Sequence, residues 1–357
     1  MAAAQEVEKP DEKMDEKPVS MKVNYEKDYS IVICAYNPDE RILTRCLKAV
    51  AALDTAGLQT EVILTDNNSR IPIRDLSYVK ACTKDLPSFH LLEVPEQGVK
   101  YARMAAIEKA RGKFIVYIDS DNEPAPDYLQ ELKKLNHRFP QVGAWGPGEV
   151  NVEFMDGIDK KIEAYARHVF QERHDTTDEF ANEREWQPCY PYGTGLCTYT
   201  FLLKEYIALA RQGAFTQPGR QGGALTSGED TQMVLLCIRK GYSAGVSPSL
   251  RLSHLIPRSR ANRKYLQRIT WGTGICYETC MLEVFPERRP QLLKRLMSES
   301  KFSRQALKRM LNATWHRNPM KQFELVRFLS LNAGIYAALG KPLPATVAGV
   351  IKFLNLA

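Results

Sequence analysis

Two aspartates that follow a predicted strand could hold a metal ion and a diphosphate. Asp119 and Asp121 stand directly after the apolar run 114–118. Residues two apart share a face while the backbone is extended, so a strand that ends here can aim both carboxylates into one crevice. Carboxylate oxygens are ligands that suit Mg²⁺ and Mn²⁺. Acidic residues after a strand also begin solvated loops or cap helices, and the pair alone leaves that interpretation open.

A second acidic pair stands at a predicted helix start. Glu229 and Asp230 follow Gly228 and precede an amphipathic run with apolar positions at Met233, Val234, Leu235 and Ile238. Negative side chains in the first turn of a helix interact favourably with the helix dipole whatever the function. The pair is therefore compatible with a structural role as well as with chemistry.

The elements that must position these residues alternate between strands and helices. Strands are predicted at 29–35, 61–65, 90–94 and 114–118, a helix begins near 38–40, and another spans 99–111 and is closed by Gly112. This alternation predicts an α/β fold with a parallel sheet and helices on both faces. Ligands bind outside the carboxyl ends of strands in such sheets. Three polar clusters fall there, at 36–37, 66–69 and 119–121.

Composition narrows the class of protein. The 357 residues are 44% hydrophobic and 25% charged, which is ordinary for a soluble globular protein. Of the eight cysteines, only Cys276 and Cys280 stand close together, so we expect reduced thiols in a cytosolic protein rather than a zinc site. Residues 1–28 lack the apolar segment of a signal peptide or membrane anchor and are expected to form a disordered, charged tail.

Five motifs occur in a specific order along the chain: Ile31–Asn37, Asp66–Ser69, Gln97–Gly98 with Ala102–Arg103, Gly112–Asp121 and Gly228–Asp230. In that order and spacing they resemble the family-2 glycosyltransferases of GT-A fold, of bacterial type, over roughly residues 29–260. The resemblance implies an inverting transferase that uses a nucleoside diphosphate sugar and Mg²⁺ or Mn²⁺.

The resemblance assigns positions to the nucleotide and its diphosphate, with Asp66 accepting a hydrogen bond from the base. These positions are Ala35, Tyr36, Asn37, Asp66, Asn68, Arg103, Asp119, Arg258 and Arg260. No Gly-x-Gly-x-x-Gly follows the first predicted strand, and the chain has no Gly-x-x-x-x-Gly-Lys-Ser/Thr loop. The nucleotide must therefore be held in another way than in dinucleotide-binding domains or nucleotide triphosphatases.

The same resemblance assigns the metal and the catalytic base. The metal ligands would be Asp119, Asp121 and His254, and Asp230 would deprotonate the acceptor hydroxyl while Glu229 supports it or contacts the acceptor. His254 stands between apolar residues, where a histidine is as often a structural residue as a ligand, and both interpretations stay open.

One stretch departs from the pattern of processive relatives. Those carry Gln-x-x-Arg-Trp after the base, whereas this chain has Gln267–Trp271 with Thr270 in place of arginine. The departure favours the addition of one sugar per encounter over synthesis of a polymer.

The C-terminal part is basic and amphipathic. Between residues 287 and 327, eleven Lys and Arg stand against Glu287, Glu299 and Glu324. The apolar stretch Phe323–Leu339 is interrupted by charges and too short to span a membrane. We expect a transferase domain at 29–270 and a helical region at 271–357, which either attaches peripherally to an anionic membrane surface or packs on the core as helical cover.

The sequence thus predicts a cytosolic hexosyl- or N-acetylhexosaminyltransferase, peripheral on the inner face of the cell membrane if the attachment holds. It would move one sugar, expected from a UDP-sugar, to a saccharide or lipid-linked saccharide acceptor in polysaccharide or glycoconjugate synthesis. A sugar-1-phosphate nucleotidyltransferase is disfavoured because 35–38 offers no Gly-rich phosphate loop. The alternative from another class is a non-catalytic nucleic-acid- or lipid-binding protein on an inactive transferase fold. The retained acidic residues argue against it, and a nucleic-acid partner is not expected.

Overall fold

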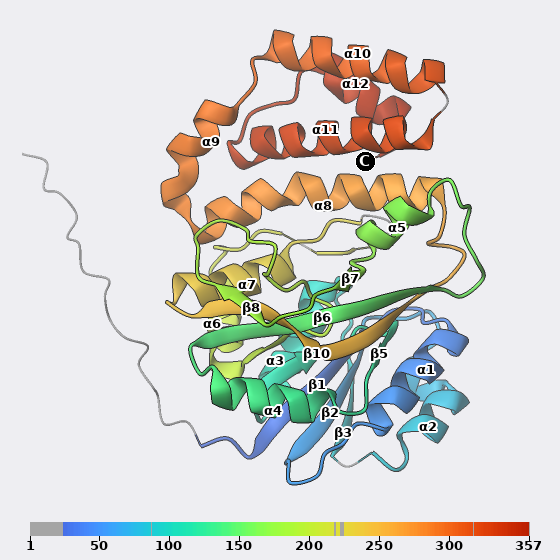
Figure 1. The fold of residues 1–357 in the computed structure, drawn as a ribbon, viewed down its shortest axis with the longest axis vertical. Coiled ribbons are helices and arrows are strands. Elements are labelled where there is room, and N and C mark those ends of the chain that lie inside the picture. Colours follow the sequence, from blue (N-terminus) through green and yellow to red (C-terminus); the bar gives the residue numbers. More distant parts are fainter. Residues whose placement is uncertain (1–23, 87, 218, 222–224, 317, 357) are drawn as a thin grey trace, which may run out of the picture.

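The structure, a computed structural model, describes residues 24–86, 88–217, 219–221, 225–316 and 318–356. A central sheet carries helices on both faces, and a stack of helices lies across one end of it (Figure 1). The predicted tail at 1–28 lies outside the described residues as far as position 23.

The first four strands form a parallel half of the sheet. They are β1 (Lys27–Ala35), β2 (Thr60–Asp66), β3 (Phe89–Glu93) and β4 (Gly112–Tyr117), in the order β3-β2-β1-β4. Every pairing among them is parallel. Helix α1 (Glu40–Ala51) connects β1 to β2, and α3 (Val99–Lys109) connects β3 to β4. The α/β prediction is confirmed for this half.

Gly112 has a different role from the one predicted. It does not close a helix, because α3 ends at Lys109 and Gly112 is the first residue of β4. A Cβ at Gly112 would lie 2.5 Å from the backbone nitrogen of Ser30. Glycine is therefore required here because β1 and β4 approach each other closely.

The second half of the sheet is mixed. The long strands β6 (Val142–Phe154) and β10 (Ser243–Ile256) pair in parallel, and β9 (Cys197–Tyr199) lies antiparallel between β4 and β6. The sheet is mostly parallel, as the sequence predicts, because its longest ladders are parallel. The short strands β5 (Asn122–Pro124), β7 (Arg173–His174) and β8 (Glu179–Ala181) also pair antiparallel.

Helices cover both faces, as predicted. On one face α1, α2 (Ser77–Thr83) and α4 (Tyr128–Arg138) bury apolar side chains against the sheet. On the other face α3, α6 (Thr200–Arg211) and α7 (Glu229–Arg239) form a second apolar cluster. The sheet is thus fixed from both sides, which holds the carboxyl ends of its strands in place.

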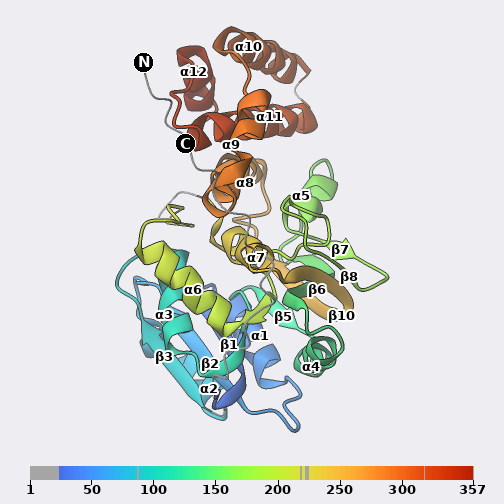
Figure 2. The ribbon, with the colours of Figure 1, turned by 90° about the vertical axis from the view of Figure 1, so that its left-hand side faces the viewer.

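The C-terminal helices form successive layers above the sheet. They are α8 (Arg263–Val284), α9 (Arg289–Arg295), α10 (Glu299–His316), α11 (Pro319–Ala338) and α12 (Ala345–Phe353). Figures 1 and 2 both show α11 between α8 and α10. The predicted domain boundary between residues 270 and 271 falls inside α8. Among the described residues, none of the helices has the length and apolar character needed to cross a bilayer.

Helix α11 packs closely on α8. A Cβ at Gly274 of α8 would lie 2.2 Å from Oγ of Ser330, and one at Gly334 of α11 would lie 2.9 Å from the carbonyl oxygen of Ile275. Most apolar side chains of α11 are buried, including Phe323 and Leu329. The apolar stretch 323–339 therefore packs as an internal layer of the protein.

Candidate active site

A cavity of about 690 Å³ lies at the carboxyl ends of β1 and β4. Its floor includes the end of β1, the face of α3, the 119–121 segment and the start of α7. Its other walls come from α5 (Glu163–Val169), α8 and α11. The predicted edge of the sheet thus carries a cavity, and the C-terminal helices close it on one side.

Arg103 of α3 joins two of the predicted acidic residues. Its Nη1 donates to Oε1 of Glu229 at 3.2 Å, and its Nη2 donates to Oδ1 of Asp119 at 3.4 Å. The guanidinium also lies 4.9 Å from the ring centroid of Tyr117. Since Arg103 is buried, these two carboxylates compensate its charge in a place that water does not reach easily.

The same burial affects Glu229. Burial disfavours the ionised carboxylate and raises the pKa of Glu229, while Arg103 opposes this shift and the nearby Asp230 adds to it. Its Oε2 accepts a hydrogen bond from the N–H of Gly228 at 3.2 Å. Glu229 therefore contacts Arg103 and its own helix start, at the edge of the cavity that it helps to line.

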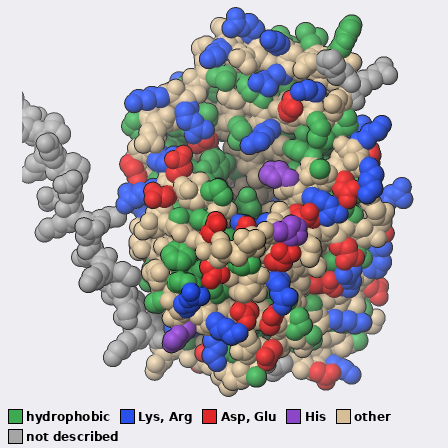
Figure 3. Space-filling view, in the orientation of Figure 1, with side chains coloured by type: hydrophobic (Ala, Val, Ile, Leu, Met, Phe, Trp, Pro, Cys, Tyr) green, Lys and Arg blue, Asp and Glu red, His purple; other side chains and the backbone are tan. Residues whose placement is uncertain are grey.

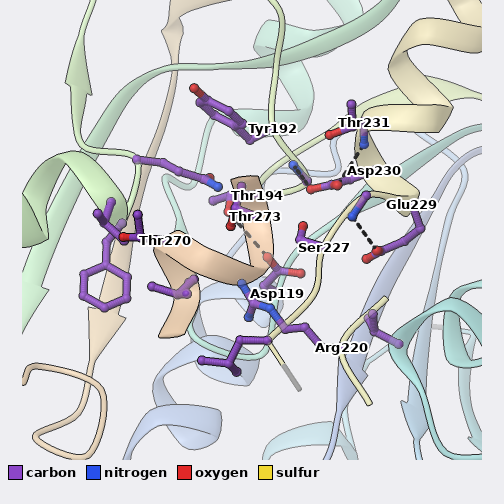
Figure 4. A pocket seen from close by; sticks show the side chains of 18 of the residues that line it. Asp119, Tyr192, Thr194, Arg220, Ser227, Glu229, Asp230, Thr231, Thr270 and Thr273 are labelled. Carbon is purple, nitrogen blue, oxygen red and sulfur yellow. Dashed lines mark hydrogen bonds between the residues drawn. The ribbon is translucent and has the colours of Figure 1, made fainter. Parts of the chain in front are cut away.

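Asp230 stands next to Glu229 but is held by different groups. Its Oδ2 accepts from the N–H of Gly193 at 3.1 Å, and its Oδ1 accepts from the N–H of Thr231 at 2.8 Å. Asp230 is half-buried and lines the cavity. Figure 4 shows the carboxylates of Asp119, Glu229 and Asp230 around the same hollow.

Asp121 lies against two basic side chains. Arg260 contacts its Oδ2, and Nε2 of His254 lies 3.4 Å from that oxygen. Burial acts to raise the pKa of Asp121, but His254 and Arg260 outweigh it, so the pKa lies well below its usual range. The pairing of Asn122 in β5 with His254 in β10 explains why these residues meet.

The orientation of His254 bears on the metal prediction. Its Nδ1 lies 2.9 Å from the carbonyl oxygen of Phe170, which can only accept, so Nδ1 carries the hydrogen. Nε2 then faces the carboxylate of Asp121. A ring fixed by a backbone carbonyl, with its other nitrogen beside a carboxylate oxygen, fits a cation placed between the two.

These donors are nevertheless few. Within the described part of the chain, no three His, Cys, Asp or Glu groups lie together as a set that could hold a metal ion. Mg²⁺ characteristically binds through one or two carboxylates together with substrate phosphates. The residues present therefore fit an ion that arrives with a diphosphate better than a metal caged by protein alone.

The predicted nucleotide-binding residues divide into two groups. Ala35, Tyr36, Arg103, Asp119 and Arg260 line the cavity. Asn37, Asp66, Asn68 and Arg258 do not belong to its lining as the described residues form it.

The residues outside the lining shape loops. Both oxygens of Asp66 accept backbone hydrogen bonds, from the N–H of Ser69 and of Ile73. Asn37 Oδ1 accepts from the N–H of Arg70, and Asn37 and Asn68 have φ values of 44° and 64°. Asparagine tolerates this left-handed conformation better than most residues. Arg258 is exposed, and its N–H donates to Asp156.

Several lining residues were not singled out by sequence reasoning. They are mostly aromatic or come from the C-terminal helices: Asn67, Tyr165, Trp186, Tyr192, Arg220, Tyr277, Arg327 and Ser330. The turn-rich loop 190–195, with two glycines, was the one available signal for Tyr192 and Gly193.

The stretch that departs from the processive pattern splits between two environments. Thr270 lines the cavity, and its Oγ1 lies 2.8 Å from the hydroxyl of Tyr165. Trp271 instead points into the apolar cluster between α8, α10 and α11. Only the first of these two side chains can therefore meet a ligand in this cavity.

Part of the chain is similar in sequence to known proteins. Residues 30–181 match the model of the family described as glycosyl transferase family 2. An N-acetylglucosaminyltransferase of Mesorhizobium japonicum is 30% identical over 266 residues, which cover 70% of this chain and 56% of that protein. One from Sinorhizobium fredii is 33% identical over 119 residues, 32% of this chain and 27% of that protein. The chain thus spans well under two thirds of the length of these relatives.

Solved structures show more distant likeness. A mannosyltransferase from Pyrobaculum calidifontis, in complex with GDP-Man and Mn²⁺, aligns with 94% of this chain and 79% of its own at 16% identity and a TM-score of 0.47. S. aureus TarS 1–349, in complex with UDP-GlcNAc, aligns with 88% of this chain and 92% of its own at 14% identity and a TM-score of 0.43. Residues 30–181 thus match glycosyltransferase family 2, the family that the ordered motifs resemble, and the mixed α/β sheet with α8–α12 after it is the architecture expected from the sequence.

Proposed function

We propose that this protein is an inverting, metal-dependent glycosyltransferase that moves a single sugar from a UDP-sugar to a saccharide or lipid-linked saccharide. The observation that carries the proposal is the cavity in which Asp230 and the Asp119–Asp121 pair face the same space. A single displacement needs a base on the acceptor side and charge compensation on the leaving side. The cavity offers both.

The donor would lie on the floor formed by β1, α3 and the 119–121 segment. Ala35 and Tyr36 are placed to contact the nucleotide, and Arg103 and Arg260 bring positive charge towards a diphosphate. N-acetylglucosamine is the proposed sugar, since that is the group named in the curated relatives. The direct contact of Asp66 with the base is not part of this placement, because its oxygens already accept two backbone hydrogen bonds.

Asp121 and His254 would hold Mn²⁺ or Mg²⁺ from the protein side, with Asp119 close by. When bound, the ion would neutralise charge that grows on the diphosphate as the glycosidic bond breaks. The guanidinium of Arg260 contacts Asp121 and compensates the charge of this carboxylate. When the metal ion is present, the guanidinium would turn to the phosphate oxygens instead.

Asp230 is the proposed base, and Glu229 the group that positions it. Asp230 accepts two backbone hydrogen bonds and lines the cavity, which leaves lone pairs for an acceptor hydroxyl. Glu229 fixes the start of α7 through Arg103. A proton taken by Asp230 would leave the site after the new bond forms at the inverted sugar carbon.

The acceptor would lie between α8, α11 and the loop 186–192. Trp186 and Tyr192 have ring centroids 5.7 Å apart and form an aromatic wall, and polar groups such as Thr270 and Arg327 also line the cavity. Sugar rings present apolar faces and polar edges, which suits such a wall. Thr270 in place of arginine supports transfer of a single sugar. The proposed location of the protein is the cytoplasm, at the inner face of the cell membrane.

Calorimetric titration of UDP and UDP-N-acetylglucosamine, with and without Mn²⁺, tests the donor part. Single-turnover transfer by the Asp230→Asn variant tests the base. We expect near-normal donor affinity and transfer reduced by at least ~100-fold, because a positioned base contributes about 10²- to 10⁴-fold. Wild-type turnover in the variant would move the base to Glu229, and failure of the wild-type chain to bind any nucleotide would favour the non-catalytic alternative.

A further inference from the structure

We infer that the outer face of α10 docks this protein onto an anionic lipid surface. The outer face comprises Lys301, Arg304, Leu307, Lys308, Leu311 and Trp315. It lies apart from the cavity that carries the carboxylates, so this inference does not depend on the proposed transferase activity.

Three apolar side chains form a stripe on this face. Leu307, Leu311 and Trp315 are spaced four residues apart, which places them on one side of a helix. They are 40%, 65% and 85% exposed. The opposite side of α10 buries Phe302 and Ala306 in the cluster shared with α11. The side chains of the stripe therefore do not take part in the packing between the helical layers.

Cations flank the stripe. Lys301, Arg304 and Lys308 are exposed, and no described residue forms a salt bridge with any of them. The only acidic residue of α10 is Glu299, at its first position. Figure 3 shows Lys and Arg side chains over the helical layers at the top of the molecule, with few acidic ones among them.

This combination selects one kind of occupant. Leucines and a tryptophan between cations match the boundary of a bilayer, where the apolar groups enter the acyl region and the cations meet anionic headgroups. A nucleic acid would satisfy the cations but leave the leucines exposed. A second copy of the same face would bring its three cations against these three.

The position of α10 fits this orientation. Figures 1 and 2 show α10 on the side of the helical layers that faces away from the sheet, with α11 next below it. Helix α11 supplies Arg327 and Ser330 to the cavity wall. Packed helices lie about 8–10 Å apart, so the cavity would stand roughly two helix layers, α10 and α11, from the lipid surface.

Vesicle sedimentation with the full chain tests whether the cations of the outer face bind anionic lipid. We expect binding to vesicles that contain phosphatidylglycerol, weaker binding as salt rises, and little binding to pure phosphatidylcholine. The double variant Lys301→Glu, Lys308→Glu should lose about five-fold in affinity or more for each cation removed. The control Lys80→Glu, Lys133→Glu makes the same change of net charge on exposed lysines of α2 and α4 and should bind like the wild type.

Tryptophan fluorescence tests the apolar stripe. Of the four tryptophans, Trp145 and Trp271 are buried and Trp315 is 85% exposed. Anionic vesicles should therefore shift the emission to shorter wavelength, and Trp315→Phe should remove the shift while keeping sedimentation. Leu311→Ser should weaken binding, whereas Ile71→Ser, at an exposed apolar residue in the loop after β2, should not.

Equal binding of the two lysine double variants would overturn the inference, as would wild-type protein that fails to sediment with anionic vesicles. Self-association that Leu311→Ser abolishes, without vesicle binding, would assign the face to a second copy. Thermal melts of each variant, compared with the wild type, separate these outcomes from loss of fold.

Discussion

The backbone N–H of Gly193 donates to Oδ2 of Asp230, and a Cβ built on Gly193 would lie only 2.7 Å from that oxygen. The same Cβ would lie 3.0 Å from Nη2 of Arg103. Gly193 thus acts as a backbone support for the proposed base, in a place where no side chain fits. The support comes from a loop between β8 and β9, far in sequence from α7.

Gly193→Ala should displace the carboxylate of Asp230 without removing it. We expect kcat to fall about 100-fold, since a misplacement of about 1 Å can cost that much, with UDP affinity nearly unchanged. The measurement is steady-state transfer beside UDP calorimetry. Gly349→Ala, at a glycine of α12 with open space around its Cβ position, is the control and should transfer normally. Similar kinetics in both variants would show that Gly193 does not position the proposed base.

Asp121→Ala should remove the metal dependence of nucleotide binding. In the wild type we expect Mn²⁺ to strengthen UDP binding, because Asp121 would hold the ion and the ion would compensate the charge of the diphosphate. In the variant the affinity for UDP should be the same with and without Mn²⁺, as measured by calorimetry. A variant that keeps the full Mn²⁺-dependent gain would show that this carboxylate does not hold the ion.

Arg103→Met should destabilise the fold as well as the site. The change leaves Glu229 unpaired beside an apolar side chain, and breaking a buried ion pair costs about 3–5 kcal/mol. Urea denaturation measures this change in the free energy of unfolding. The double variant Arg103→Met, Glu229→Gln should recover part of the loss, because the remaining side chain is neutral. No recovery would mean that packing, rather than charge, dominates at Arg103.

From the environment of Glu61 we expect the protein to lose stability in acid. Its buried carboxylate accepts from Ser30 Oγ and from the N–H of Arg111, both at 2.6 Å, and from Arg111 Nε at 3.1 Å. Burial acts to raise the pKa of Glu61, but these hydrogen bonds outweigh it, so the pKa is lowered from 4.5. A lowered pKa in the folded state gives stability that is present above pH 4.5 and is lost as the pH falls below it.

Glu61→Gln should therefore cost about 1.5–3 kcal/mol at neutral pH, the contribution typical of hydrogen bonds to a charged group. Unfolding curves of wild type and variant, measured from pH 7 down to pH 3, should converge as the pH falls. Curves that stay parallel over this range would show that the ionised carboxylate does not stabilise the fold.

The first half of the fold could be predicted from sequence because local patterns carry it. The strand at 29–35 and the helix from Val99 were expected and occur, with small changes at their ends. The antiparallel strand β9 has only three residues, too few to give an alternating pattern. The order of strands in the second half depends on such short segments, so the sequence alone could not supply it.

The site was predictable where residues follow strands or begin helices. Asp119, Asp121 and Asp230 do so, and the structure brings them to one cavity together with Arg103 from within α3. Asp66 is the last residue of β2, yet its side chain accepts hydrogen bonds from the loop that follows the strand. The wall from α11 was not foreseen, because Arg327 reaches the cavity only through the close packing of Gly274 on Ser330.

The floor and one wall of the cavity come from separate stretches of sequence, so specificity for the acceptor can change independently of specificity for the donor. The floor comes from residues before 122 and around 230, while one wall comes from α8 and α11 near the end of the chain. In the proposed placement of donor and acceptor, substitutions on the cavity side of α11 would therefore change which acceptor enters, without disturbing the groups that would hold the donor. Grafting the cavity-facing positions of α11 between related proteins would then exchange their acceptors and leave the choice of nucleotide unchanged.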